Sequence, residues 1–257
     1  MDFRSRIAQR LEMEKEDLPF LEKNLELGDA NGSATNTLAL THRFLGVAQY
    51  LLEGRASAFR SCLSRASDLR ASLIERFDSG NSIDDSYVSI LSYKFLFDSL
   101  AAGDIVLAER LARLLGGRRQ IESRYDHEFD RALGYSLRSC VRLDRRDLDQ
   151  WLPRFAAQCK STATRPFVGL VMAFEGFRVS EARAVNDGLS EFCAGYGALS
   201  RPGMPFHLME DEGLNVWGIG FANLARAHGI ATEPRPPLIP SDLLISIGCA
   251  PQEPGPG

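Results

Sequence analysis

The strongest constraint on the fold is the absence of proline between Pro19 and Pro153. Proline breaks the interior of a helix, so a long proline-free stretch with apolar residues at helical spacing is typical of packed helices. The composition agrees, because the chain has 61 Leu and Ala residues against 26 Val, Ile and Thr residues. Leu and Ala favour helix, whereas the β-branched residues favour strand. The sequence therefore predicts an all-α fold.

Four tight polar turns separate the helical patterns, at Gly54, Gly103, Asp144 and Gly176. In a helical hairpin a glycine adopts the left-handed conformation after one helix, and a short polar side chain caps the next. The spacing of the turns is too irregular for a regular tetratricopeptide array. We expect antiparallel helical hairpins stacked into a curved, solenoid-like and tetratricopeptide-like single domain.

The organisation along the chain follows from these patterns. Residues 1–30 form an N-terminal helical segment of one or two helices, with the division between two helices expected near the Asp17-Leu18-Pro19 sequence. Residues 31–248 form the helical-hairpin domain, and residues 249–257 form a disordered tail. Within the domain, a helix capped by Ser82 or Asp84 is expected to run to Ala102. It is apolar on nearly every side, which predicts that it is the most buried helix.

Charge and cysteine usage exclude several classes of protein. The net charge of −4 argues against a nucleic-acid partner. No apolar run approaches the ~20 residues of a membrane span, and the N-terminus is charged rather than apolar. Five cysteines at wide spacing, with no Cys-x-x-Cys pair, indicate neither a disulfide framework nor a zinc site. We therefore expect a cytoplasmic protein with no nucleic-acid or membrane partner, and the sequence leaves its oligomeric state open.

Catalytic chemistry has one candidate location, the sequence Asp126-His-Glu-Phe-Asp130. Asp126, His127 and Asp130 could ligate a metal on one face of a helix, but no second histidine lies nearby. Carboxylates in the first turn of a helix are also favoured by the helix dipole, which explains the cluster without a metal. The sequence predicts no catalytic residue, metal or cofactor.

Two acidic segments are candidates for a partner surface. Asp84 and Asp85 form one, and Glu210, Asp211 and Glu212 form the other. The second also has an ordinary explanation, as a helix start that complements the dipole. A basic face is a weaker candidate, because eleven arginines in residues 104–154 interleave with nine carboxylates.

The order of features resembles the bacterial immunity protein 49 family of polymorphic toxin systems. The resemblance spans roughly residues 40–245. It rests on the helical stretch Leu96 to Leu115, the hairpin Leu170 to Phe192, and the pattern Gly220-Phe-Ala-Asn-Leu-Ala-Arg-Ala-His-Gly229 with the following Pro-Pro-Leu-Ile-Pro240-Ser-Asp-Leu-Leu. It implies a cytosolic antitoxin without catalytic residues.

The leading hypothesis is an immunity protein that neutralises a cognate toxin effector by stoichiometric binding. Asp84, Asp85, Glu210, Asp211 and Glu212 are then the candidate toxin-binding residues, suited to a basic toxin. The alternatives are a tetratricopeptide-like adaptor that binds peptides in a concave groove, and a metal-dependent helical hydrolase that uses Asp126, His127 and Asp130.

Overall fold

The computed structural model describes residues 2–248 of the chain, and this part confirms the predicted all-α fold. It contains eleven α-helices and five short 3-10 helices, and its one β-type contact is an isolated bridge between Arg235 and Ile239. None of the described helices is both long and apolar enough to cross a membrane. The α-helices are α1 (Phe3–Leu27), α2 (Ser33–Glu53), α3 (Ala56–Asp78), α4 (Tyr93–Ala102), α5 (Ile105–Leu114), α6 (Arg119–Tyr125), α7 (Glu128–Val141), α8 (Arg145–Gln158), α9 (Val168–Arg178), α10 (Ala182–Leu199) and α11 (Val216–Ala227).

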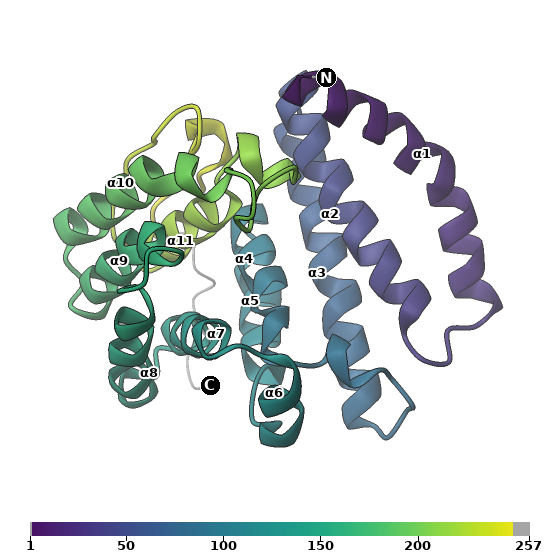
Figure 1. Cartoon of the computed structure of the whole chain (residues 1–257), viewed down its shortest axis with the longest axis horizontal. Coiled ribbons are helices and arrows are strands. Elements are labelled where there is room, and N and C mark those ends of the chain that lie inside the picture. Colours follow the sequence, from purple (N-terminus) through teal and green to yellow (C-terminus); the bar gives the residue numbers. More distant parts are fainter. Residues whose placement is uncertain (1, 249–257) are drawn as a thin grey trace, which may run out of the picture.

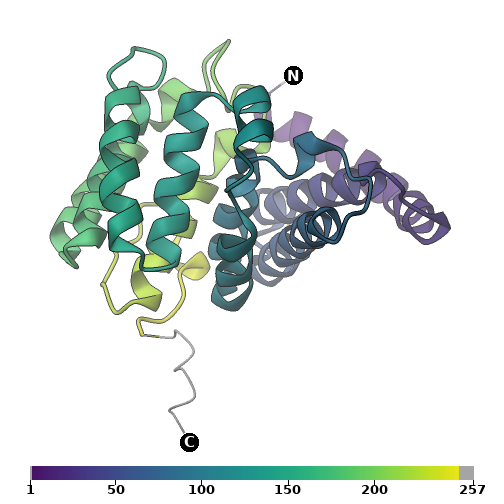
Figure 2. The ribbon, with the colours of Figure 1, turned by 90° about the horizontal axis from the view of Figure 1, so that it is seen from below.

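The helices stack in the order of the chain, as Figures 1 and 2 show. Contacts join α1 to α2, α2 to α3, α4 to α5, α7 to α8 and α9 to α10, which confirms the stack of helical hairpins. The last helix departs from chain order, because α11 packs against α4 near the middle of the molecule and also contacts α10. Trp217 of α11 stacks on Phe97 of α4, with ring centroids 5.1 Å apart. The two halves of the stack are therefore joined through a shared aromatic core.

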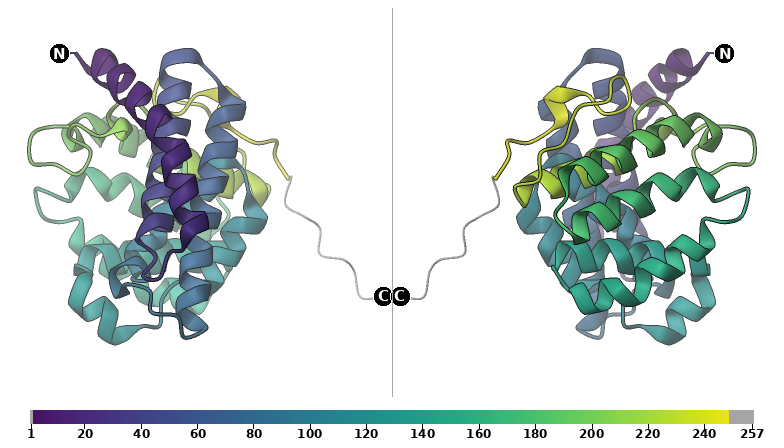
Figure 3. Two further views of the ribbon diagram at one scale, coloured as in Figure 1. Left: turned by 90° about the vertical axis from the view of Figure 1, so that its right-hand side faces the viewer. Right: turned by 90° about the vertical axis from the view of Figure 1, so that its left-hand side faces the viewer.

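Helix α1 is continuous through Pro19, so the segment forms one helix of the one or two predicted, and the division near Asp17 does not occur. Pro19 and Lys15 are both exposed, and the Lys15 carbonyl that loses its helical donor can be solvated instead. Ile7 and Leu11 are the buried residues of α1 and pack with apolar residues of α2. Helix α1 thus forms the outer layer on one side of the molecule, opposite α9 and α10 (Figure 3). The predicted boundary near residue 30 falls in the turn between α1 and α2, and the predicted tail 249–257 lies outside the described residues.

The segment before α4 differs from the prediction of one helix from residue 82 or 84 to 102. It forms two 3-10 turns, Asp85–Tyr87 and Ile90–Ser92, and the α-helix begins at Tyr93. Asp84 accepts a hydrogen bond from the Ser86 amide, and Ser89 accepts one from the Leu91 amide. These short side chains compete with the helical hydrogen-bond ladder. Within α4 itself, every residue but Lys94 is buried, as the apolar pattern predicts.

The predicted turns form, although two of them use a different residue in the left-handed conformation. Gly54 and Gly103 have φ of +69° and +79°, as predicted. In the other two turns Leu143 and Ser180 take this conformation. Gly176 lies inside α9 instead, where a Cβ would stand 2.6 Å from the Val185 amide nitrogen of α10. Its role is close helix packing rather than chain reversal.

Candidate functional site

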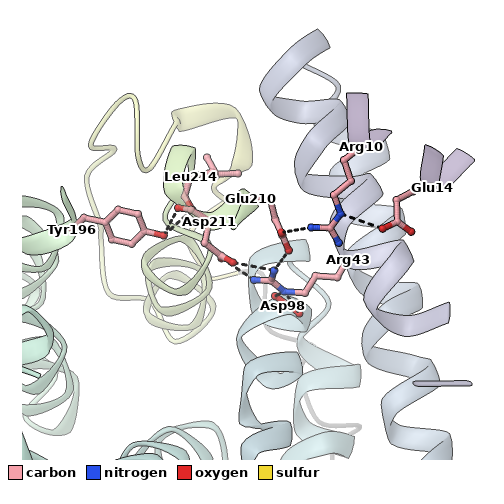
Figure 4. Close-up of polar contacts among 8 residues, drawn as sticks. All are labelled: Arg10, Glu14, Arg43, Asp98, Tyr196, Glu210, Asp211 and Leu214. Carbon is pink, nitrogen blue, oxygen red and sulfur yellow. Dashed lines mark hydrogen bonds and ion pairs between the residues drawn. The ribbon is translucent and has the colours of Figure 1, made fainter. Parts of the chain in front are cut away.

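Arg43 is a buried arginine whose guanidinium group contacts three carboxylates. Helix α2 directs it toward α4 and the 3-10 turn Glu210–Gly213, and 8% of its surface is exposed. Its Nε donates to Asp98 Oδ2 at 3.0 Å and its Nη2 donates to Asp211 Oδ1 at 2.8 Å. Its Nη1 donates to both Glu210 and Asp211. Figure 4 shows this arrangement, in which one side chain joins three separate segments of the chain.

Arg10 and Tyr196 extend the network on its two sides. Nη1 of Arg10 lies 3.5 Å from Glu210 Oε2, and its guanidinium carbon is 3.9 Å from the centroid of the Phe44 ring. The Tyr196 hydroxyl donates to the carbonyl oxygen of Asp211 at 2.7 Å. We refer to Arg10, Arg43, Asp98, Glu210 and Asp211 as the Arg43 cluster. It links α1, α2, α4 and the 3-10 turn before α11.

The Arg43 cluster holds three carboxylates against two guanidinium groups. Asp98 is 0% exposed, so its charged form is poorly solvated. Burial, together with the neighbouring charges of Asp211 and Glu210, raises the pKa of Asp98 from 3.8 to about 7 against the opposing effect of Arg43. Asp98 can therefore hold a proton near neutral pH.

The raised pKa of Asp98 predicts a pH-dependent stability. The folded chain keeps a proton between pH 4 and 7 that the unfolded chain releases, so the free energy of unfolding falls as the pH rises through this range. Asp98→Asn removes this titration. As the pH rises, the free energy of unfolding of the variant should therefore fall less steeply than that of the native chain, by up to ~1 kcal/mol per pH unit. Chemical denaturation of both proteins at several pH values between 5 and 8 measures the difference.

The comparison between the two proteins isolates Asp98 from other titrating groups. Burial lowers the pKa of His42 and of His228, so these side chains reduce stability as the pH falls, which is the opposite direction. Both proteins contain them, and their effect cancels. Parallel stability curves for the native chain and Asp98→Asn would show that Asp98 is already ionised in the folded state.

A pocket of about 640 Å³ lies beside the Arg43 cluster and is lined on one wall by its residues. Its floor is aromatic, and Tyr93, Phe206 and Trp217 are nearly inaccessible to solvent themselves. Its rim carries apolar side chains that remain exposed, with Leu40 at 48% and Met209 at 41%. We call it the α2–α4 groove. It is lined by Arg10, Leu40, Arg43, Tyr93, Lys94, Phe95, Phe129, Asp130, Ala163, Thr164, Phe167, Gly203, Met204, Pro205, Phe206, Met209, Glu210, Asp211 and Trp217.

The structure corrects the predicted role of two acidic residues. Glu210 and Asp211 are 3% and 4% exposed, so they do not present an acidic surface to a partner. Their carboxylates bind Arg43, and they form one wall of the α2–α4 groove. Glu212 is half-buried and forms an ion pair with Arg6 of α1 at 2.5 Å.

The other acidic candidates lie elsewhere and are more accessible. Asp84 is exposed and Asp85 is half-buried, in a turn that contacts α3 and α6. The structure does not bring them together with residues 210–212, which contact α2. Hydrogen bonds from the Ser86 hydroxyl and amide lower the pKa of Asp84, which favours its charged form.

The side chains of the possible metal site each have a structural partner. Asp126 accepts from the Ile90 amide at 3.1 Å, and His127 Nδ1 accepts from the Phe129 amide as the N-cap of α7. Asp130 accepts from the Tyr93 hydroxyl at 2.9 Å. Across residues 2–248, no group of three or more His, Cys, Asp or Glu side chains is placed to hold a metal ion.

Sequence reasoning missed Arg43 and Asp98, although a signal was present. Asp98 is the only charged residue besides Lys94 in α4, which is otherwise apolar on all sides. An acidic side chain in such a helix must be buried, and a buried carboxylate needs a partner. The partner is 55 residues away, and local spacing gives no means of choosing it.

Comparison with protein-family models, with curated proteins and with solved structures finds no match to this chain.

Proposed function

We propose that this chain is an immunity protein that binds a cognate toxin in a one-to-one complex and blocks it. A segment of the toxin occupies the α2–α4 groove. The proposal combines the resemblance to the immunity protein 49 family with the shape and chemistry of this groove. Its scaffold is a stack of helices, and its action is binding rather than catalysis.

The observation that carries the proposal is the exposed apolar rim over an aromatic floor. Leu40 and Met209 lie on opposite chain segments, in α2 and in the loop before the 3-10 turn, and both remain accessible. Exposed apolar side chains around a concave site are typical of protein-binding surfaces. Lys94 and Asp130 place one charge of each sign in the lining, which can orient the incoming segment.

The Arg43 cluster supports this role by fixing one wall of the groove. Glu210 and Asp211 hold the 3-10 turn against α2, and the loop that carries Met209 enters this turn directly. A binding surface that is already ordered loses less entropy when the partner binds. The Arg43 cluster therefore supports binding indirectly, because it fixes the position of Met209 at the rim of the α2–α4 groove.

The proposal predicts a toxin gene next to the gene of this chain, and binding to the product of that gene tests it. The double variant Leu40→Asp with Met209→Asp should bind the toxin at least ~100-fold more weakly than the native chain, because two apolar contacts are replaced by solvated charges. Isothermal titration measures the affinity and the stoichiometry of both proteins.

A matched control places the same two charges elsewhere. Val106 and Leu143 are 61% and 60% exposed and do not line the groove. The variant Val106→Asp with Leu143→Asp should keep the native affinity. An equal loss of affinity in both double variants would show that the groove is not part of the interface.

A tetratricopeptide-like adaptor is the second candidate, because an apolar groove also suits a short peptide. The two functions differ in what they require of the partner. An adaptor would bind an isolated peptide segment without inhibiting a toxin, whereas an immunity protein must abolish the toxin's activity in the complex. An activity assay of the toxin with increasing amounts of this chain separates them.

A further inference from the structure

A second pocket, of about 560 Å³, lies between α6, α7 and α8 and contains three arginines. Arg119 comes from α6, Arg131 from α7 and Arg154 from α8. We call it the arginine pocket, and its other lining residues are Gln120, Glu122, Ser123, Tyr135, Gln150 and Trp151. It shares no lining residue with the α2–α4 groove.

The pocket has a rigid aromatic wall. Trp151 stacks on Tyr135, with centroids 4.3 Å apart and planes at 7°. The Tyr135 hydroxyl accepts from the Gly117 amide at 2.8 Å and donates to Glu122 at 2.9 Å. The guanidinium carbon of Arg154 lies over the Trp151 ring at 4.7 Å from its centroid. This contact restricts the long Arg154 side chain, which reduces the entropy lost when it binds a ligand.

The positive charge of the pocket is only partly neutralised by neighbouring carboxylates. Among residues 2–248, no carboxylate lies within ion-pair distance of Arg119 or Arg154. Arg131 pairs with Glu128, but its Nε is buried and has no hydrogen-bond acceptor in the described chain. The only carboxylate of the lining, Glu122, is 4% exposed and already binds Tyr135. Arg119 and Arg154 are exposed and carry no ion pair within the described residues, and the buried Arg131 Nε lacks an acceptor there, so the three side chains together leave donors free for an anionic ligand.

We propose that the arginine pocket binds a small multivalent oxyanion, carried by an organic phosphate or a polycarboxylate. Arginines from three helices line one concave space, and planar guanidinium donors match carboxylate and phosphate oxygens. The volume lies in the range of small-molecule sites. Tyr135 and Arg154 both pack on the Trp151 ring, so the site recognises charge rather than a stacked base.

Titration with two probes tests the arginine pocket and distinguishes the two possible classes of ligand. Pyrophosphate and citrate are added to the full chain at constant ionic strength, with chloride as the reference anion, and binding is followed by calorimetry. We expect saturable one-to-one binding of at least one probe with a dissociation constant below ~1 mM. Tighter binding of pyrophosphate identifies a phosphate ligand, and tighter binding of citrate identifies a polycarboxylate.

Variants locate the binding in the arginine pocket. Arg119→Gln with Arg154→Gln should weaken it at least ~10-fold, because two charge-assisted contacts are lost. Arg142→Gln with Arg146→Gln removes two exposed arginines outside the pocket and should leave it unchanged. If the first double variant does not fold, as judged by its thermal melt, Arg119→Gln alone replaces it. Absence of saturable binding at ~10 mM of either probe, or equal losses in both double variants, would overturn the proposal.

Discussion

Replacement of Arg43 by methionine is expected to destabilise the chain by ~3–5 kcal/mol. The arginine is 8% exposed and binds Asp98, Glu210 and Asp211, so its removal leaves three buried carboxylates with only the more distant Arg10 for compensation. Methionine keeps the apolar volume of the arginine stem, so the lower free energy of unfolding reflects the removal of the guanidinium charge. Thermal and urea denaturation at pH 7.5 measure it.

An exposed arginine serves as the control for Arg43→Met. Arg142 lies at the end of α7, is exposed, and forms no ion pair within the described chain, so Arg142→Met should change the stability by less than ~0.5 kcal/mol. Addition of Asp98→Asn to Arg43→Met should recover part of the loss, because it removes one of the unpaired charges. A stability loss for Arg43→Met as small as that of Arg142→Met would contradict the role of the cluster.

Substitution of Gly169 by alanine is also expected to have a large effect. It should lower the free energy of unfolding by ~3 kcal/mol or more. Helices α9 and α10 approach so closely that a Cβ on Gly169 would stand 2.1 Å from the amide nitrogen of Phe192. A Cβ on Gly188, across the same contact, would stand 2.3 Å from the amide nitrogen of Ala173. Backbone atoms cannot move aside as a side chain can, so the two helices must separate.

Gly197 of α10 provides a matched control for Gly169. A Cβ at Gly197 meets nothing within 4 Å, so Gly197→Ala should leave the stability unchanged or raise it by up to ~1 kcal/mol through helix propensity. Urea denaturation of the two variants gives the comparison. A similar small effect for both substitutions would show that α9 and α10 tolerate a wider spacing.

Local patterns predicted the features that depend on local physics. The Gly103–Asp104 turn forms as expected, with Gly103 left-handed and Asp104 accepting from the Leu107 amide at 3.1 Å. Gly176 was misassigned because a glycine that ends a helix and a glycine that lets two helices touch look alike in a sequence. Only the position of α10 distinguishes them.

Tertiary pairing explains why the acidic segment was misread. Glu210 and Asp211 stand next to the start of α11, where local reasoning assigns them to the helix dipole or to a surface. Their partner, Arg43, is 167 and 168 residues earlier in the chain, within an apolar face of α2. Charge pairing over such a separation depends on how α2, α4 and α11 pack, and it cannot be predicted from the spacing of residues along the chain.

The fold also distributes charge over the accessible surface differently from what the sequence indicates. The acidic residues expected to meet a basic partner are partly buried, whereas Arg119 and Arg154 remain free of carboxylates within residues 2–248. Counts of charges along residues 104–154 are nearly balanced and predicted no strong field. The fold gathers three arginines from separate helices around one pocket, and this creates a local excess that the counts conceal.

Growth of cells that express the predicted cognate toxin tests the immunity proposal most directly. Co-expression of the native chain should restore growth, and co-expression of Val106→Asp with Leu143→Asp should restore it equally. The variant Leu40→Asp with Met209→Asp, produced at the same level and with an unchanged thermal melt, should fail to protect. Growth arrest that persists with the native chain at a molar excess over the toxin would contradict the proposed function.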